Sequence, residues 1–83
     1  MKIQRVIAVY QKNGEALIEE IIISLTTEFL IELFQIDIEG DPDVYLCYFV
    51  NESHFLKLKN LIPVLSKYDL NEVEMYVECF QIN

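Results

Sequence analysis

Residues 37–43, Asp-Ile-Glu-Gly-Asp-Pro-Asp, place four carboxylates in one short segment. Such a segment could bind a hard cation, because these ions prefer several oxygen ligands. The spacing does not match an EF-hand loop, in which a central glycine and a closing bidentate glutamate have set positions. Gly40 and Pro42 form turns and explain the segment without an ion. We expect no metal site, and we interpret Asp41 and Asp43 as part of an acidic contact surface.

Other residues that could do chemistry lack the neighbours that catalysis needs. His54 is the only histidine, and it stands beside Glu52 with no orienting group in view. Gly14 and Gly40 are isolated turn glycines, which excludes a phosphate-binding loop. The serines stand in capping or turn contexts rather than in a nucleophile elbow: Ser24, Ser53 and Ser66. We therefore expect neither an enzyme nor a bound cofactor.

The two cysteines, Cys47 and Cys79, each lie in an apolar run of residues and are not spaced as a C-x-x-C pair. This pattern is typical of buried, reduced thiols that pack as small hydrophobic groups. It does not indicate a metal site or a redox pair.

Residues 71–82 carry the clearest candidate surface. With the period of a strand, Val73, Met75, Val77 and Cys79 fall on one side, which is a core face. The other side mixes three carboxylates with two aromatic rings, a composition suited to contact with a positively charged partner. We interpret that side as partner-binding: Glu72, Glu74, Tyr76, Glu78 and Phe80.

Length and charge narrow the classes of function. A chain of 83 residues allows a single domain, residues 1–83, and leaves little material for an enclosed substrate pocket. The net charge of −8 repels phosphate backbones, so we expect no direct nucleic-acid ligand. The same charge would attract a basic protein partner over a long range. With no signal peptide and no apolar run long enough to span a bilayer, we expect a soluble cytoplasmic protein without membrane contact.

The elements that position these residues follow from periodicity and turn signals. Residues 3–10 and 16–24 predict two strands joined by the Asn13-Gly14 turn, a strong hairpin signal. Thr26 and Thr27 precede a short helix that ends near Gln35 or Ile36. Residues 44–50 are apolar on both sides and predict a central, deeply buried strand.

A second helix follows the cap Asn51, and a final strand completes the chain. We expect a break near Ile62, since Pro63 cannot continue a helix. The inward stripe of this helix is Phe55, Leu58, Leu61, Ile62 and Leu65. The order β-β-α-β-α-β predicts an α+β fold with a mixed, roughly four-stranded sheet and both helices on one face. A right-handed crossover would pair the last two strands in parallel.

Several stretches, taken in order along the chain, resemble small bacterial immunity proteins of contact-dependent growth inhibition and related toxin systems. They are Arg5-Val6, Asp41-Pro42, Tyr45-Leu46-Cys47-Tyr48, Lys67-Tyr68-Asp69 and Tyr76-Val77-Glu78-Cys79-Phe80. The resemblance implies an inhibitor that binds a cognate toxin and covers the active site or substrate groove of that toxin. The kind of toxin that it favours is a basic nuclease domain. No catalytic residue is assigned from this resemblance. A different function, a homodimeric structural or regulatory module closed by the exposed face of the sheet, also fits the residues.

Overall fold

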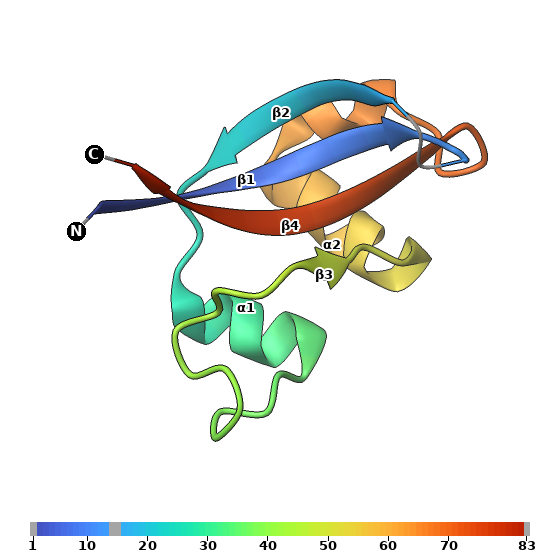
Figure 1. Cartoon of the computed structure of the whole chain (residues 1–83). Helices are drawn as coiled ribbons and strands as arrows, with labels where there is room; N and C mark the ends of the chain where they lie inside the picture. Colours follow the sequence, from blue (N-terminus) through green and yellow to red (C-terminus); the bar gives the residue numbers. More distant parts are fainter. Residues whose placement is uncertain (1, 14–15, 83) are drawn as a thin grey trace.

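The computed structural model describes residues 2–13 and 16–82, and it confirms an α+β fold with the order β-β-α-β-α-β (Figure 1). A short 3₁₀ helix, η1, follows the second α-helix. The elements are β1 (Lys2–Gln11), β2 (Leu17–Ile23), α1 (Thr27–Phe34), β3 (Tyr48–Phe49), α2 (Glu52–Leu61), η1 (Pro63–Lys67) and β4 (Val73–Ile82).

The four strands form one sheet in the order β2-β1-β4-β3, and every neighbouring pair is antiparallel. The predicted parallel pairing of the last two strands is therefore wrong, and the sheet is not mixed. Figure 1 shows the reason, because α2 and η1 run across the strands rather than back along them. The chain consequently enters β4 at the end of the sheet toward which β3 points, and β4 runs the opposite way.

The centre of the sheet is the pair β1 and β4, whose register runs from Lys2↔Ile82 to Gln11↔Val73. On its other side β1 pairs with β2, which confirms the predicted antiparallel hairpin. A bulge between Val9 and Tyr10 shifts that register near the turn. Gly14 of the predicted Asn-Gly turn lies outside the described residues.

Both helices begin with the caps that the sequence predicts. The Thr26 side chain accepts a hydrogen bond from the N–H of Phe29 at 3.1 Å, and α1 ends at Gln35 in the left-handed conformation. The Asn51 side chain accepts from the N–H of His54, and His54 Nδ1 accepts from the N–H of Asn51, which completes a capping box. The predicted break is also confirmed, since α2 ends at Leu61 and η1 begins at Pro63.

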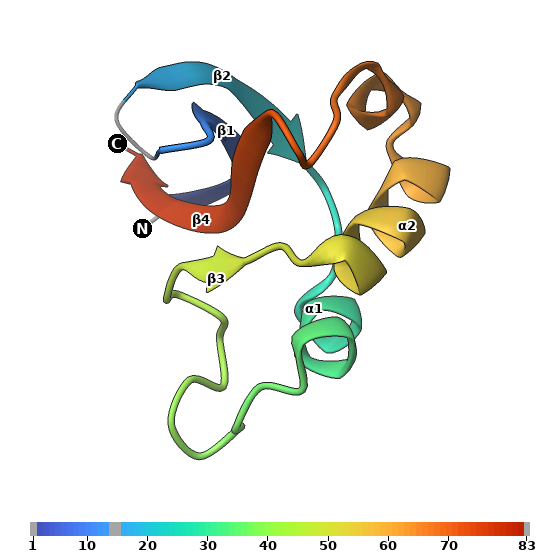
Figure 2. The ribbon, with the colours of Figure 1, turned by 90° about the vertical axis from the view of Figure 1, so that its right-hand side faces the viewer.

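Odd-numbered residues of the two central strands face the helices and form the core with them. From the second helical region Phe55, Leu58 and Leu65 are buried, as predicted, whereas Leu61 is 53% exposed because the helix ends there. The large, fully buried side chains are Ile7, Val9, Leu30, Val44, Val50, Leu58, Leu65, Met75 and Val77. Figure 2 shows α1, α2 and η1 on the same side of the sheet.

The predicted central strand over residues 44–50 is wrong. Its only paired residues, Tyr48 and Phe49, form a short strand at the edge of the sheet. Val44 adopts a left-handed conformation with φ 56°, which a β-branched residue rarely takes and which breaks an extended run. The next two backbone N–H groups, of Tyr45 and Leu46, donate to the Asp41 carboxylate and so are not available to a neighbouring strand.

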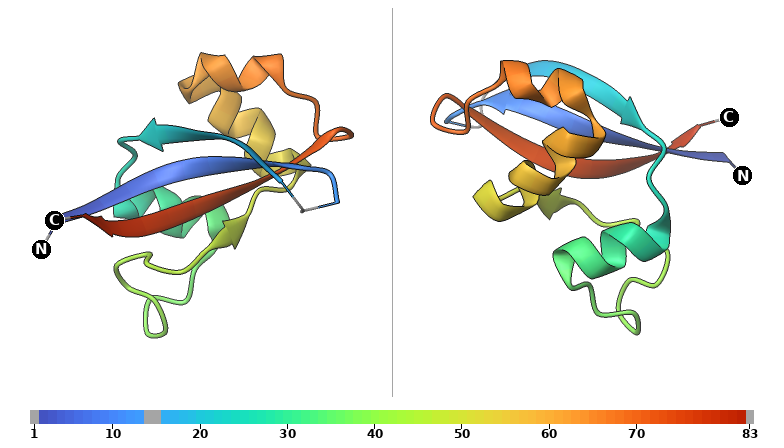
Figure 3. Two further views of the ribbon diagram at one scale, coloured as in Figure 1. Left: turned by 45° about the horizontal axis from the view of Figure 1, so that its top comes forward. Right: turned by 180° about the vertical axis from the view of Figure 1, so that it is seen from behind.

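The face of the sheet opposite the helices, here called the outer face, is covered by no helix of residues 2–13 and 16–82. It points toward the viewer in Figure 1, and the view from behind in Figure 3 shows the helices in front of the opposite face. Neither α-helix in this part of the chain is long and apolar enough to cross a membrane.

Candidate functional site

Three aromatic rings cross the middle of the outer face, from β1 over β4 to β3. The rings of Tyr10 and Tyr76 meet edge to face with centroids 5.8 Å apart. Tyr76 also meets Phe49, its register partner on β3, with centroids 5.5 Å apart. Edge-to-face contacts of this kind stabilise a pair beyond its buried area, by about 0.5–1.5 kcal/mol. The rings therefore form a continuous, ordered row.

Carboxylates of β4 lie on both sides of this row. Glu78 Oε2 accepts a hydrogen bond from the Tyr10 hydroxyl at 2.9 Å, and the Cys47 thiol lies 3.8 Å from the same oxygen. Glu74 Oε2 accepts from the Tyr76 hydroxyl at 3.4 Å. On the far side of β1, Glu20 pairs with Ala8. The acids and the rings alternate across neighbouring strands, so one partner could contact both.

The electrostatic field of these carboxylates acts on the groups beside them. The hydrogen bond to Glu78, together with burial, raises the pKa of Tyr10. Burial, together with the charge of Glu74, raises the pKa of Tyr76. Cys47 is exposed as a residue, but partial desolvation of its sulfur, together with the nearby Glu78, raises the pKa of the thiol. All three groups therefore stay protonated at neutral pH and act as hydrogen-bond donors around a negative centre.

A shallow hollow of about 310 Å³, open to solvent, is lined by Tyr10, Cys47, Tyr76 and Glu78. Beneath the outer face the β1 residues Val6 and Ala8 are buried, although they face away from the helices. The hollow is near the lower end of the range for small-ligand sites, about 300–1,000 Å³. Its size suits one side chain or small group rather than a peptide segment.

The basic residues lie away from this hollow. Lys12 donates to the backbone oxygen of Leu70, and Lys67 forms an ion pair with Glu19 on the helix side of the sheet. Arg5 donates to the backbone oxygen of Asp43 at 2.6 Å. The two remaining helix lysines, Lys57 and Lys59, belong to α2, and Lys2 pairs with Ile82 at the far end of β1. The middle of the outer face is therefore acidic.

Most of the predicted contact residues do share this face. Glu74, Tyr76 and Glu78 lie together on β4 around the ring row. Phe80 is further along the same strand, opposite Gln4, and is 37% exposed. Glu72 is exposed in the turn that precedes β4, before the strand begins. The structure thus brings three of the five together, and it places Phe80 further along β4 and Glu72 in the turn before this strand.

Asp41 requires a correction, because it is buried rather than part of an exposed acidic surface. Its Oδ1 accepts from the N–H of Tyr45 at 2.9 Å, and its Oδ2 accepts from the N–H of Leu46 at 3.1 Å and from the Tyr48 hydroxyl at 2.6 Å. Burial alone would raise the pKa of Asp41, but these hydrogen bonds outweigh it and lower the pKa. Asp43, the other predicted loop contact, is exposed.

Three residues of the site were not predicted from the sequence to belong to it: Tyr10, Cys47 and Phe49. Alternation along β1 already places Tyr10 on the side of Gln4, Val6 and Ala8, but only the register with β4 brings it to Tyr76. Cys47 was predicted to be buried, and this is wrong, because it is exposed in the segment before β3. Cys79, by contrast, is half-buried on the opposite side of β4 from Glu78.

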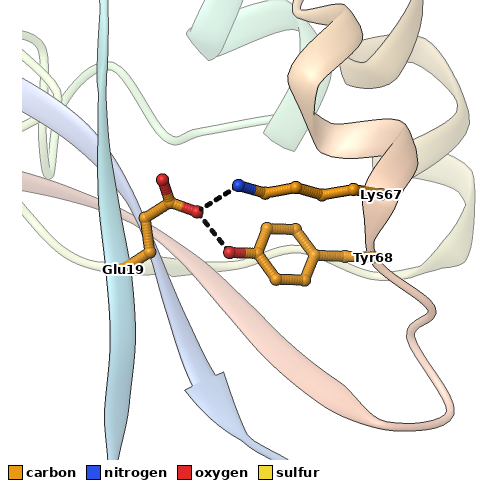
Figure 4. Close-up of polar contacts among 3 residues, drawn as sticks. All are labelled: Glu19, Lys67 and Tyr68. Atoms are coloured by element: carbon orange, nitrogen blue, oxygen red, sulfur yellow. Dashed lines mark hydrogen bonds and ion pairs between the residues drawn. The ribbon is translucent and has the colours of Figure 1, made fainter.

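Polar groups elsewhere have structural roles. His54 caps α2, and burial lowers its pKa. Glu19, on the helix side of β2, accepts from the Tyr68 hydroxyl and pairs with Lys67 at 3.0 Å, which ties β2 to η1 (Figure 4). These two bonds lower the pKa of Glu19, that from Tyr68 more than that from Lys67. Across residues 2–13 and 16–82 no three histidine, cysteine or acidic side chains are placed to hold a metal ion.

Comparison with known proteins assigns the chain to a family. A search of curated proteins and a search of solved structures each found no match. A family model, however, spans residues 4–78, which include all of β2, α1, β3, α2 and η1 and the part of β4 that carries Glu74, Tyr76 and Glu78. The chain therefore belongs to the family described as Domain of unknown function (DUF7683).

Proposed function

We propose that the protein is a cytoplasmic immunity protein that binds a cognate toxin domain through its outer face and so inhibits it. The observation that carries the proposal is the acidic and aromatic row on an otherwise uncovered sheet face. Tyr and Phe anchors beside charged groups are typical of protein interfaces. The resemblance of the chain to immunity proteins of toxin systems supports the same function.

The charge of the face indicates the nature of the partner. A surface with Glu74 and Glu78 beside aromatic rings is complementary to a basic groove, such as that of a nuclease. In such a groove the carboxylates would occupy positions that bind nucleic-acid phosphates. The net charge of −8 would speed the encounter, and salt would slow it. A stable contact needs about 800 Å² on each partner, which the sheet face and its adjoining loops can supply.

The first experiment is co-expression of the tagged protein with the polypeptide encoded directly upstream, followed by co-purification at low and high salt. We expect a stoichiometric complex whose association rate falls as salt rises, and recovery of growth in cells that produce the polypeptide. Absence of both a complex and growth recovery would contradict the proposal.

Charge reversal then tests which face binds. The double variant Glu74→Lys, Glu78→Lys should weaken the complex by at least ~100-fold, because it turns two attractive contacts into repulsive ones. The matched control is Glu32→Lys, Glu39→Lys, which makes the same change in net charge at exposed positions of α1 and the following loop. Equal loss of affinity in both variants would mean that the net charge of the protein, and not the outer face, determines the affinity for the toxin.

A second candidate function is a homodimeric structural or regulatory module. It is favoured by exposed isoleucines on β2, where Ile22 is 67% and Ile18 is 47% exposed, and by the position of β2 at the edge of the sheet. Against it, two copies of the same glutamate row would repel each other. A mass in light scattering that stays monomeric as concentration rises would exclude this function, whereas a clean dimer without a toxin complex would favour it.

A further inference from the structure

We propose that the hollow between Tyr10, Cys47, Tyr76 and Glu78 receives one arginine side chain of the protein partner. This inference rests on the proposed function only for the identity of the partner. The property of the hollow itself, selective binding of a guanidinium group, can be measured on the protein alone.

The carboxylate of Glu78 supplies the charge. Its Oε2 is held by the Tyr10 hydroxyl at 2.9 Å, which fixes the orientation of the group. Among the described residues no hydrogen bond is made to the other oxygen, Oε1, and none of the basic side chains forms an ion pair with Glu78. A carboxylate that is already oriented and still has acceptor capacity is suited to a charge-assisted bond from an incoming donor.

The rings supply the walls. Tyr10 and Tyr76 stand at 80° to each other, so a planar group that stacks on one ring turns its edge toward the other ring. A cation within about 6 Å of a ring centroid is attracted to the ring face, and guanidinium groups make this contact more often than ammonium groups. Arginine also offers a planar fork of donors that can stack and reach a carboxylate at the same time.

The protonation states around the hollow also favour a cation. Tyr10 and Cys47 remain neutral at neutral pH because Glu78 and burial raise their pKa values. The charge nearest the hollow is therefore negative, and Glu74 adds to it from the other side of Tyr76. An anion would be repelled, and an apolar group would cover Glu78 without satisfying it.

The test is an NMR titration of the full chain with N-acetyl-arginine amide. N-acetyl-citrulline amide, which has nearly the same shape without the charge, is the control ligand. We expect saturable shift changes confined to Tyr10, Cys47, Tyr76 and Glu78, with a dissociation constant on the order of 10 mM. Citrulline should bind at least ~5-fold more weakly. Equal binding of both ligands, or shifts spread over all acidic residues, would overturn the inference.

Conservative variants separate the contributions. Glu78→Gln keeps the size and an acceptor for Tyr10, and should weaken arginine binding by at least ~10-fold. Glu32→Gln removes the same charge from an exposed position on α1 and should leave binding within ~2-fold. Tyr76→Phe should retain binding and Tyr76→Leu should reduce it, since the ring face and not the hydroxyl makes the contact. An equal effect of the two glutamate variants would contradict a defined site.

The same titration with N-acetyl-lysine amide tests the choice of arginine, and equal or tighter binding of lysine would overturn it. Failure of this inference is distinguishable from failure of the proposed function. A toxin complex that forms, with no selective arginine binding, would leave the function standing and reject the hollow as its anchor. Selective arginine binding without any toxin complex would confirm the hollow as an arginine site and reject the proposed function.

Discussion

Replacing Asp41 by asparagine tests whether a buried carboxylate builds the loop before β3. Asp41 is 7% exposed, and its two oxygens accept three hydrogen bonds, two of them from backbone N–H groups. Asparagine keeps the size of the side chain but replaces one oxygen by an NH₂ group. The Tyr48 hydroxyl can rotate to accept from that group, whereas the N–H of Leu46 cannot.

The expected loss follows from these contacts. An N–H without an acceptor costs about 1–3 kcal/mol when it is buried, and the loss at Leu46 lies at the lower end because this bond is only part-buried. Hydrogen bonds to a charged acceptor contribute about 1.5–3 kcal/mol each. We expect Asp41→Asn to lower the free energy of unfolding by about 2–3 kcal/mol, because the two remaining bonds survive in weaker, uncharged form. A domain of this size has a total stability of about 4–12 kcal/mol. The midpoint of thermal unfolding should fall by roughly 10–20 °C.

Urea denaturation at pH 7, followed by circular dichroism, measures this loss, and its pH dependence identifies the group. The pKa of Asp41 in the folded state lies below the ordinary value. The stabilisation by the charged Asp41 side chain is therefore complete above about pH 5, and it is lost as the pH falls through the ordinary pKa and then the folded-state pKa. The difference between the wild type and Asp41→Asn should be constant from pH 7 to about pH 5 and should shrink at lower pH.

Asp43→Asn is the matched control. Asp43 is two residues from Asp41, and its side chain is exposed, so this variant removes the same charge without removing a buried group. Its unfolding free energy should stay within about 0.5 kcal/mol of the wild type. The reasoning would be refuted if both variants lost the same stability, or if Asp41→Asn also stayed within that margin.

Three further measurements test individual contacts. Gln35→Gly should raise the unfolding free energy by about 0.5–1 kcal/mol, measured in urea, because Gln35 ends α1 with φ 52°, a conformation that glycine adopts without strain. Burial and the bond to Asp41 raise the pKa of Tyr48 to about 12. The stabilisation that the neutral Tyr48 hydroxyl provides should therefore be lost only as the pH rises from about 10 through 12. The phenolate absorbance step of Tyr48 in this range should be absent in Tyr48→Phe. Partial desolvation and Glu78 raise the pKa of the Cys47 thiol. Glu78→Gln should lower this pKa, so that more thiolate is present at pH 8 and Cys47 reacts faster with a disulfide reagent. An unchanged reaction rate would count against the contact between Cys47 and Glu78.

Local signals in the sequence were sufficient for much of the fold. Thr26 and Asn51 act as caps through bonds to residues three positions ahead, so the information lies within one helical turn. Pro63 ends α2 because of its own ring and missing N–H. Alternation in the last strand correctly separated Val73, Met75 and Val77, which are buried, from the residues of the outer face.

Features that depend on distant partners were not predictable in this way. The apolar residues 44–50 have the composition of a central strand, yet a carboxylate and a left-handed Val44 keep residues 44–47 out of the sheet. The direction of β4 depends on how α2 crosses the sheet, which periodicity does not report. For the same reason β4 could be assigned to the candidate site from its own pattern, whereas Tyr10 and Phe49 join it only through the register of neighbouring strands.

The position of β4 has a consequence for the order in which the molecule is made. This strand lies at the centre of the sheet, yet it follows all the other elements along the chain. Until β4 has left the ribosome, β1 has an open edge and β3 has no strand to pair with. Glu74, Tyr76 and Glu78 lie on β4 and therefore emerge after β1, β2 and β3. Under the proposed function, a chain interrupted before β4 gives the cell no protection, because the centre of the sheet and the binding face both depend on this one strand.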